Sequence, residues 1–306
     1  MEQHYAGASE VADYTCYRVR EPLPLDGRLE AAAWQQAPQS PRFVDVVSGR
    51  PGLYDTRAAA LWDDEALYIG FWLEEPFVAA ELMERDSLIF YENDIEVFID
   101  GGDCYYEFEM NALGTIYEVF LIWQDAYRRG SKFDIPEFDL LGRPALSFGG
   151  NFDRAGQSMW WGAHPRKARW AFPDWDFPGV RAAVFIDGKL NDPLTVDRGW
   201  RVELAFPWSG MGPLADGRAL PPRDGDIWRL LFRALREAEP ARQRCLHRPS
   251  LEPDRLDRQP RAGVLHAGAF LDAVRGRTLT RLAPSSRHHR GGGRGHEHPT
   301  QSPSSF

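Results

Sequence analysis

Five carboxylates lie close together along the chain and could do chemistry as a group: Glu92, Asp94, Glu96, Glu107 and Glu109. A glycoside hydrolase needs two carboxylates about 5 to 10 Å apart across a cleft. The same groups can also accept hydrogen bonds from hydroxyls, or simply form an acidic sheet face that water solvates. Residue types and spacing alone leave hydrolysis, binding and a purely structural role open.

The elements that must position these acids are two strands with a strict period of two. In DIEVFID (94–100) the acids and one Phe alternate with Ile95, Val97 and Ile99. In YYEFEM (105–110) Glu107 and Glu109 alternate with large apolar residues, and a Gly-Gly-Asp turn separates the two runs. This alternation predicts an antiparallel hairpin with one buried apolar face and one acidic, aromatic face.

Further strands are predicted along the chain, so the fold class is all-β, a two-sheet antiparallel sandwich. A hairpin is expected from 56–61 and 66–73, with further strands at 115–123 and 200–206 and a last strand within 224–235. The hairpin closes across Asp63 and Asp64, which are typical turn formers and are also weak candidates for calcium ligands. An Asp-Gly turn before 28–34 leads into a helical turn that ends on Trp34.

The predicted domain organisation is a lead-in at 1–17, one sandwich domain at 18–236 and a tail at 237–306. An insertion at 128–180 has no clear period yet carries Trp160, Trp161 and Trp175, so we expect it to be ordered, either as a lid over the binding face or as a structural excursion. The tail contains no Trp and is rich in Arg, Pro, Gly, Ser and His, which predicts disorder or a frameshifted end.

Composition excludes several functional classes. The net charge of −9 argues against a nucleic-acid partner, and the 306 residues contain no apolar run of membrane-spanning length. The three Cys are scattered without metal-binding or disulfide spacing. Because no apolar leader is visible, we expect a cytoplasmic protein, or a secreted one if the true start lies upstream. The oligomeric state is not predicted.

Four stretches in order resemble the family 9 carbohydrate-binding modules and their stand-alone relatives. They are LDGRLEAAAW (25–34), TRAAALWDDEALYIGFWLEEP (56–76), DSLIFYENDIEVFIDGGDCYYEFEMNALGT (86–115) and LNDPLTVDRGWRVELAFPW (190–208). The resemblance implies a sandwich of two antiparallel sheets related to electron-transfer and haem-binding domains. It also implies a saccharide partner, bound as a sugar end or a short saccharide, and structural calcium in some members. An association with glycoside hydrolases and carbohydrate catabolism is implied as well.

The resemblance transfers only part of the family's site. Phe90, with Tyr91 beside it, stands where the family has a tryptophan that stacks on the sugar, and Glu96 matches a glutamate that bonds sugar hydroxyls. Glu109 stands where the family has an arginine, which removes a donor, and Asn111 matches a retained polar position. The second stacking tryptophan expected from the C-terminal part is missing.

The leading interpretation is a carbohydrate-binding protein that does not catalyse, with no cofactor assigned. Its predicted ligand-binding residues are aromatic or polar: Phe90, Tyr91, Glu96, Glu109, Asn111, Trp160, Trp161 and Trp175. One alternative is a glycoside hydrolase that uses Glu96 and Glu109. Another is a haem-binding electron-transfer domain, for which Met110, Met159 and His164 are the available axial ligands.

Overall fold

The computed structural model describes residues 12–45, 49–148, 166, 168–237 and 264–278, the last as a backbone strand. Within these residues the elements, in chain order, are as follows: β1 Ala12–Arg18, α1 Ala32–Gln36, β2 Val44–Asp45, β3 Thr56–Trp62, β4 Ala66–Glu74, η1 Ile89–Tyr91, β5 Asp94–Asp100, β6 Cys104–Asn111, β7 Ile116–Trp123, η2 Pro136–Phe138, β8 Leu146–Phe148, β9 Arg169–Phe172, β10 Arg181–Asp187, β11 Gly199–Pro207, η5 Trp208–Gly210, η6 Gly212–Leu214, β12 Ile227–Glu237 and β13 Val264–Thr278.

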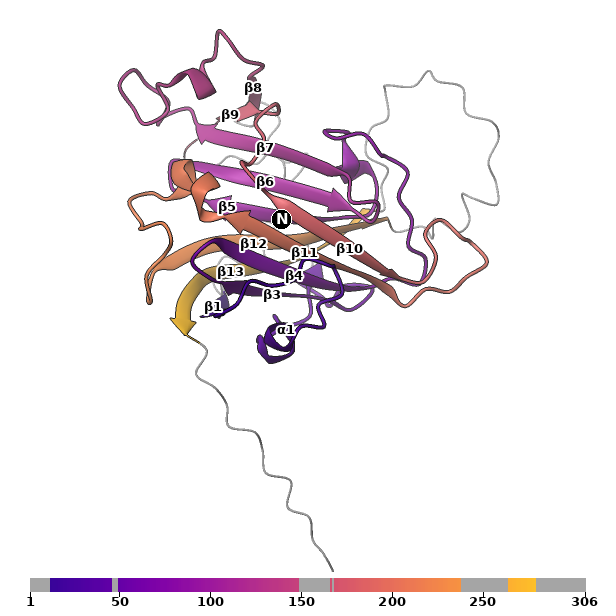
Figure 1. The fold of residues 1–306 in the computed structure, drawn as a ribbon. Coiled ribbons are helices and arrows are strands. Elements are labelled where there is room, and N and C mark those ends of the chain that lie inside the picture. Colours follow the sequence, from indigo (N-terminus) through magenta and orange to yellow (C-terminus); the bar gives the residue numbers. More distant parts are fainter. Residues whose placement is uncertain (1–11, 46–48, 149–165, 167, 238–263, 279–306) are drawn as a thin grey trace, which may run out of the picture.

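The strands form a sandwich with two layers. One layer has the order β10-β11-β4-β3-β1 and the other β12-β5-β6-β7-β9-β8, with β13 hydrogen-bonded between β1 and β12. All pairings are antiparallel except those of β1 with β3 and β13. Figure 1 shows β10, β11 and β4 crossing in front of β12, β5 and β6. The predicted all-β sandwich is confirmed.

The core lies between the two layers and is built from the apolar face of each strand. Ile95, Val97 and Ile99 of β5 are fully buried there. Rings contact each other across the layers, with centroids 5.5 Å apart for Phe71 and Phe232 and 5.4 Å apart for Phe108 and Phe206. Because side chains alternate along a strand, burial of this face turns the acids of β5 and β6 to the opposite, outer face.

The β5–β6 turn follows the predicted Gly-Gly-Asp sequence. Gly102 adopts a φ of 72°, in the left-handed region that glycine occupies at no steric cost, and its N–H donates to Asp100 Oδ1 at 2.9 Å. The turn fixes the register of the hairpin, in which Glu96 lies opposite Glu109 and Asp94 opposite Asn111.

The predicted turn before α1 is also present and is fastened to the first layer. Gly27 has a φ of 72° and its N–H donates to the buried carboxylate of Glu203 on β11 at 3.2 Å. Trp34 of α1 donates its indole N–H to the same carboxylate at 2.7 Å. Glu203 therefore anchors the N-terminal segment to β11.

The described parts of the insertion extend the second layer and do not stand apart from it. β9 pairs with β7, and β8 pairs with β9. Trp175 is buried in the core, where its indole N–H donates to Glu137 at 2.6 Å. The backbone N–H of Phe177 donates to the buried Glu118 at 2.8 Å. This part of 128–180 is a structural excursion, and residues 149–165 and 167 lie outside the described residues.

Two boundaries differ from the sequence prediction. β1 begins at Ala12 and pairs with β3 and β13, so the sandwich begins before residue 18. β13 occupies 264–278, within the tail predicted to be disordered, and its backbone joins the two layers. The physical reason is that a strand between two others gains backbone hydrogen bonds on both edges, which composition does not reveal. The remainder of the predicted tail after Glu237 lies outside the described residues.

Cys16 and Cys104 are free and buried. None of the helices in the described residues is long and apolar enough to cross a membrane.

Candidate functional site

The candidate site is the outer face of the second layer, where strands β5, β6 and β7 lie side by side. On β5 this face carries Asp94 and Glu96, and on β6 it carries Glu109, directly opposite Glu96. Tyr117 of β7 is the next residue across, opposite Glu109. We call Asp94, Glu96 and Glu109 the carboxylate cluster.

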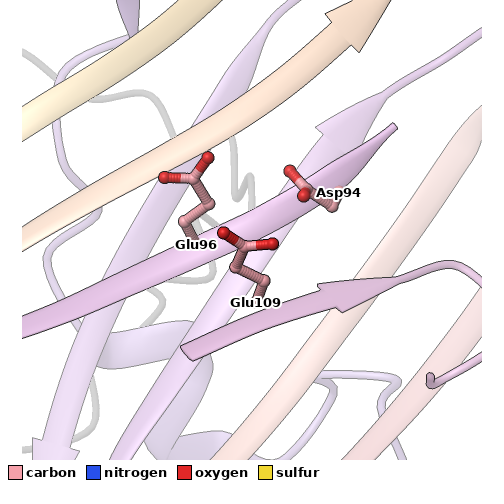
Figure 2. Close-up of side chains that lie close together, drawn as sticks. All are labelled: Asp94, Glu96 and Glu109. Atoms are coloured by element: carbon pink, nitrogen blue, oxygen red, sulfur yellow. The ribbon is translucent and has the colours of Figure 1, made fainter. Parts of the chain in front are cut away.

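The carboxylate cluster is compact and buried. Asp94, Glu96 and Glu109 are 0%, 1% and 2% exposed, and one carboxylate oxygen from each lies within 4.8 Å of the other two. Figure 2 shows Asp94 and Glu96 projecting from the same strand and Glu109 from its neighbour, with all three carboxylates on one side of the sheet. Three acidic groups are thus held together out of water.

One cation from the described residues faces the cluster. Arg233 of β12 places its Nη1 2.7 Å from Glu96 Oε2, and both side chains are almost fully buried. Among the described residues Glu96 Oε2 accepts no hydrogen bond, so this contact is an ion pair. Arg233 therefore offsets one negative charge of the three.

Two further oxygens of the cluster have no hydrogen-bond donor in the described part of the chain. They are Asp94 Oδ2 and Glu109 Oε2. The other oxygen of Asp94 accepts only a long bond, 3.4 Å, from the backbone N–H of Leu235. A buried acceptor without a donor costs about 1–3 kcal/mol, and more if it is charged, so this site favours a ligand that brings donors or positive charge.

Burial controls the protonation of the cluster. Burial is the largest cause that raises the pKa of Asp94 and of Glu109, and neighbouring carboxylates raise both further. Burial also raises the pKa of Glu96 to about 7, although the Arg233 charge opposes the shift. The cause in each case is that a low-dielectric surrounding disfavours the charged form.

Aromatic rings border the cluster on the side of η1. Tyr91 is 54% exposed, and its ring packs against Phe90 with centroids 4.7 Å apart. Phe90 in turn makes an edge contact with Tyr117, at 5.7 Å between centroids. The predicted stacking residues Phe90 and Tyr91 therefore form a continuous aromatic surface that reaches the cross-strand neighbour of Glu109.

A second aromatic group on this layer was not predicted. Arg169 of β9 donates to the Tyr105 hydroxyl at 2.9 Å and lies over the rings of Trp123 and Phe148, at 5.0 and 5.1 Å from their centroids. Arginine stacked on aromatic rings is held flat and retains donors at its edge. The signal that could have found it is weak, because β9 lies in a stretch without periodicity.

Asn111 is adjacent to the cluster, but its amide is used within the fold. Its Nδ2 donates to Leu82 O and to Glu92 Oε1, at 2.8 and 2.6 Å. Its Oδ1 accepts the backbone N–H groups of Leu113 and Thr115, each at 3.0 Å. The predicted hydroxyl-binding role of Asn111 is therefore replaced by a structural one, closure of the β6–β7 turn.

Of the three predicted tryptophans, only Trp175 belongs to the described residues, and it does not border this face. Trp175 lies in the core against Tyr106 and Phe120, which corrects its assignment as a stacking residue. The reason is that the insertion adds apolar side chains to the core, which a loop-like pattern conceals. Trp160 and Trp161 lie outside the described residues.

The weak calcium candidates in the β3–β4 turn, Asp63 and Asp64, already have partners within the fold. Both oxygens of Asp63 are occupied: they accept the N–H groups of Glu65 and Ala66 and the Tyr68 hydroxyl at 2.7–2.8 Å. Asp64 forms an ion pair with Arg18. These contacts are those of turn-forming acids, and the calcium-ligand role of Asp63 and Asp64 stays a prediction.

Among the candidate haem ligands, Met110 is fully buried in the core between the layers. Met159 and His164 lie outside the described residues.

No family model matches the chain, and no curated protein matches it. Solved structures of low identity are similar to it. A candidate carbohydrate-binding protein from Bacteroides uniformis ATCC 8492 has 11% identity and a TM-score of 0.47, over 87% of this chain and 99% of that one.

Two structures of a family 9 carbohydrate-binding module from Caldicellulosiruptor kristjanssonii are also similar. The glucose complex has 11% identity and a TM-score of 0.45, over 89% of this chain and 98% of that one. The cellotriose complex has 9% identity and a TM-score of 0.44, over 89% and 100%. At these identities and TM-scores the similarity does not establish the fold or the site, and both follow from the strand pairing and side-chain contacts of this chain.

Proposed function

We propose that this protein binds a saccharide on the outer face of β5, β6 and β7, without catalysis. The observation that carries the proposal is the pairing of buried acceptors lacking donors with an exposed aromatic surface. Glu109 Oε2 has no donor among the described residues, and Tyr91 is exposed on the same side of the hairpin.

A pyranose has complementary properties. Its C–H face is apolar and stacks on aromatic rings, while its hydroxyls are donors that carboxylates accept. In this arrangement Tyr91 and Phe90 supply the stacking surface. Glu96 and Glu109 accept hydrogen bonds from the hydroxyls.

The expected affinity is modest. Each stacked ring contributes about 0.5–1.5 kcal/mol beyond the area that it buries, and a charge-assisted hydrogen bond about 1.5–3 kcal/mol. Ordering costs oppose these contributions. A dissociation constant between about 1 µM and 1 mM, or about −8 to −4 kcal/mol, follows. The finer assignment, to sugar ends or short saccharides used in carbohydrate catabolism, rests on the sequence resemblance.

The test begins with a glycan array probed with the full-length chain, followed by calorimetric titration of the best saccharide. We expect Tyr91→Ala to weaken binding at least fivefold. Phe185→Ala is the matched control, since this ring contacts Arg28 and Arg201 on the other layer. Equal losses in both variants, or no binding of any saccharide, would contradict the proposal.

The glycoside hydrolase alternative is tested on the same material. Glu96 and Glu109 lie close enough to act together, so release of reducing sugar is measured for the wild type and for Glu96→Gln and Glu109→Gln. We expect no release from any of the three. Release by the wild type that both variants lose would favour the enzyme.

A further inference from the structure

We infer that Asp94, Glu96 and Glu109 bind a divalent cation, and that calcium is the best-fitting ion. The assignment does not depend on saccharide binding. It rests on the convergence of three buried carboxylates from adjacent strands. It also rests on one oxygen of each carboxylate, Asp94 Oδ2, Glu96 Oε2 and Glu109 Oε2, that has no hydrogen bond among the described residues.

The donor set selects a hard cation. All three ligands are carboxylate oxygens, which prefer magnesium, calcium or manganese over softer metals. No described His or Cys forms a ligand group with them. Zinc and copper sites, which favour nitrogen and sulfur, do not match this chemistry.

The spacing favours calcium within that group. Oxygens on opposite sides of a calcium ion are about 4.6–5.2 Å apart, since each lies 2.3–2.6 Å from the metal. For magnesium, at 2.0–2.1 Å, the corresponding span is only about 4.0–4.2 Å. The cluster's oxygens all lie within 4.8 Å of one another, so they fit inside the span of a calcium ion's opposite ligands. Calcium also tolerates irregular coordination, whereas magnesium demands near-ideal octahedral geometry.

The charge balance also favours a dication. When all three carboxylates are ionised, they and the single Arg233 guanidinium carry a net charge of −2, buried where an uncompensated charge is expensive. A 2+ ion neutralises that remainder. Asp94 Oδ2 and Glu109 Oε2, which lack donors within the described ranges, then become ligands, and both residues are almost fully buried.

The cluster is not explained by a structural need of the hairpin. The strand pairing, the turn at Gly102 and the apolar face of Ile95 and Val97 already specify β5 and β6. Charged residues on a buried face oppose this fold unless something compensates them. Calcium accepts six to eight oxygens, so positions remain for water or for a sugar hydroxyl next to Tyr91.

The test is calorimetric titration of calcium chloride into the full-length, EDTA-treated chain without saccharide. We expect one site in the wild type and at least tenfold weaker binding in Glu109→Gln and in Asp94→Asn. Asp64→Asn is the matched control. It removes an exposed acid at the other place where calcium ligands were considered, and it should change the affinity less than twofold.

A second measurement separates ligand loss from misfolding. In EDTA, Glu109→Gln should melt at or above the wild-type temperature, because a like charge is removed from the cluster. Calcium should raise the melting temperature of the wild type only. Three results would overturn the inference. They are no calcium binding by the wild type, wild-type calcium affinity in Glu109→Gln and Asp94→Asn, or loss of calcium binding in Asp64→Asn. Saccharide binding that persists in EDTA without any calcium site would leave the proposed function intact and remove this inference alone.

Discussion

Arg236 of β12 lies almost fully buried and forms an ion pair with Glu75, its Nη1 2.7 Å from Glu75 Oε2. The same oxygen accepts the indole N–H of Trp200 at 2.7 Å, and the other carboxylate oxygen accepts an N–H of Asn93. Arg236 also donates to Thr56 at 3.2 Å. The contacts join β12 to the first layer at the residue where the chain's composition changes.

Arg236→Met should destabilise the fold by about 3–5 kcal/mol, because it leaves the Glu75 carboxylate buried without its counter-charge. Adding Glu75→Gln should recover about 2 kcal/mol, because it removes that buried charge. The amide oxygen of the introduced glutamine can still accept from Trp200, and Asn93 can turn its own amide to accept from the glutamine N–H. The free energy of unfolding is measured by denaturant titration with tryptophan fluorescence.

Arg18→Met is the control for this cycle. Its ion pair with Asp64 is exposed, so the expected cost is below about 1 kcal/mol. If Arg236→Met costs no more than Arg18→Met, or if the double variant recovers nothing, Arg236 is not paired with Glu75 in the folded chain. The interpretation of 236 as part of the sandwich would then be wrong.

Three further predictions follow from single residues. Gly199→Ala should lower the free energy of unfolding by about 3 kcal/mol in the same titration. Gly199 has a φ of 135°, and an added Cβ would lie 1.9 Å from the Leu73 carbonyl oxygen. A loss under about 1 kcal/mol would contradict this. Asn111→Ala should lower the free energy of unfolding by about 2–3 kcal/mol, because Leu82 O and the N–H groups of Leu113 and Thr115 lose their hydrogen bonds to the amide. A variant as stable as the wild type would refute the structural role. Burial raises the pKa of Glu203, so folding favours its protonated form. The free energy of unfolding of the wild type should therefore fall as the pH rises above about 4.5, and that of Glu203→Gln should fall less steeply. Equal pH dependence in the two proteins between about pH 4 and 7 would contradict this prediction.

Local alternation was sufficient to predict the hairpin and its two faces. A period of two in residues 94–100 requires that Ile95, Val97 and Ile99 share one side, and burial of that side leaves the acids on the other. The turn glycine and the position of Phe90 and Tyr91 before β5 are local features too, so the sequence was informative about them.

Local patterns could not show what faces the acids. Arg233 comes from β12 and Arg169 from β9, and strand pairing over such sequence distances leaves no periodic signal in either segment. The burial of Trp175 and the saturation of Asn111 by turn N–H groups depend on tertiary contacts in the same way. Residue type suggested a ligand role for both, whereas their surroundings assign them to the fold.

The most direct test of the proposed site is the position of a bound saccharide in a crystal structure of the full-length protein. We predict a sugar ring stacked on Tyr91, with a hydroxyl bound to Glu96 or Glu109 directly or through one cation. A saccharide seated on the other layer, or on this face without contact to Tyr91 and these carboxylates, would contradict it.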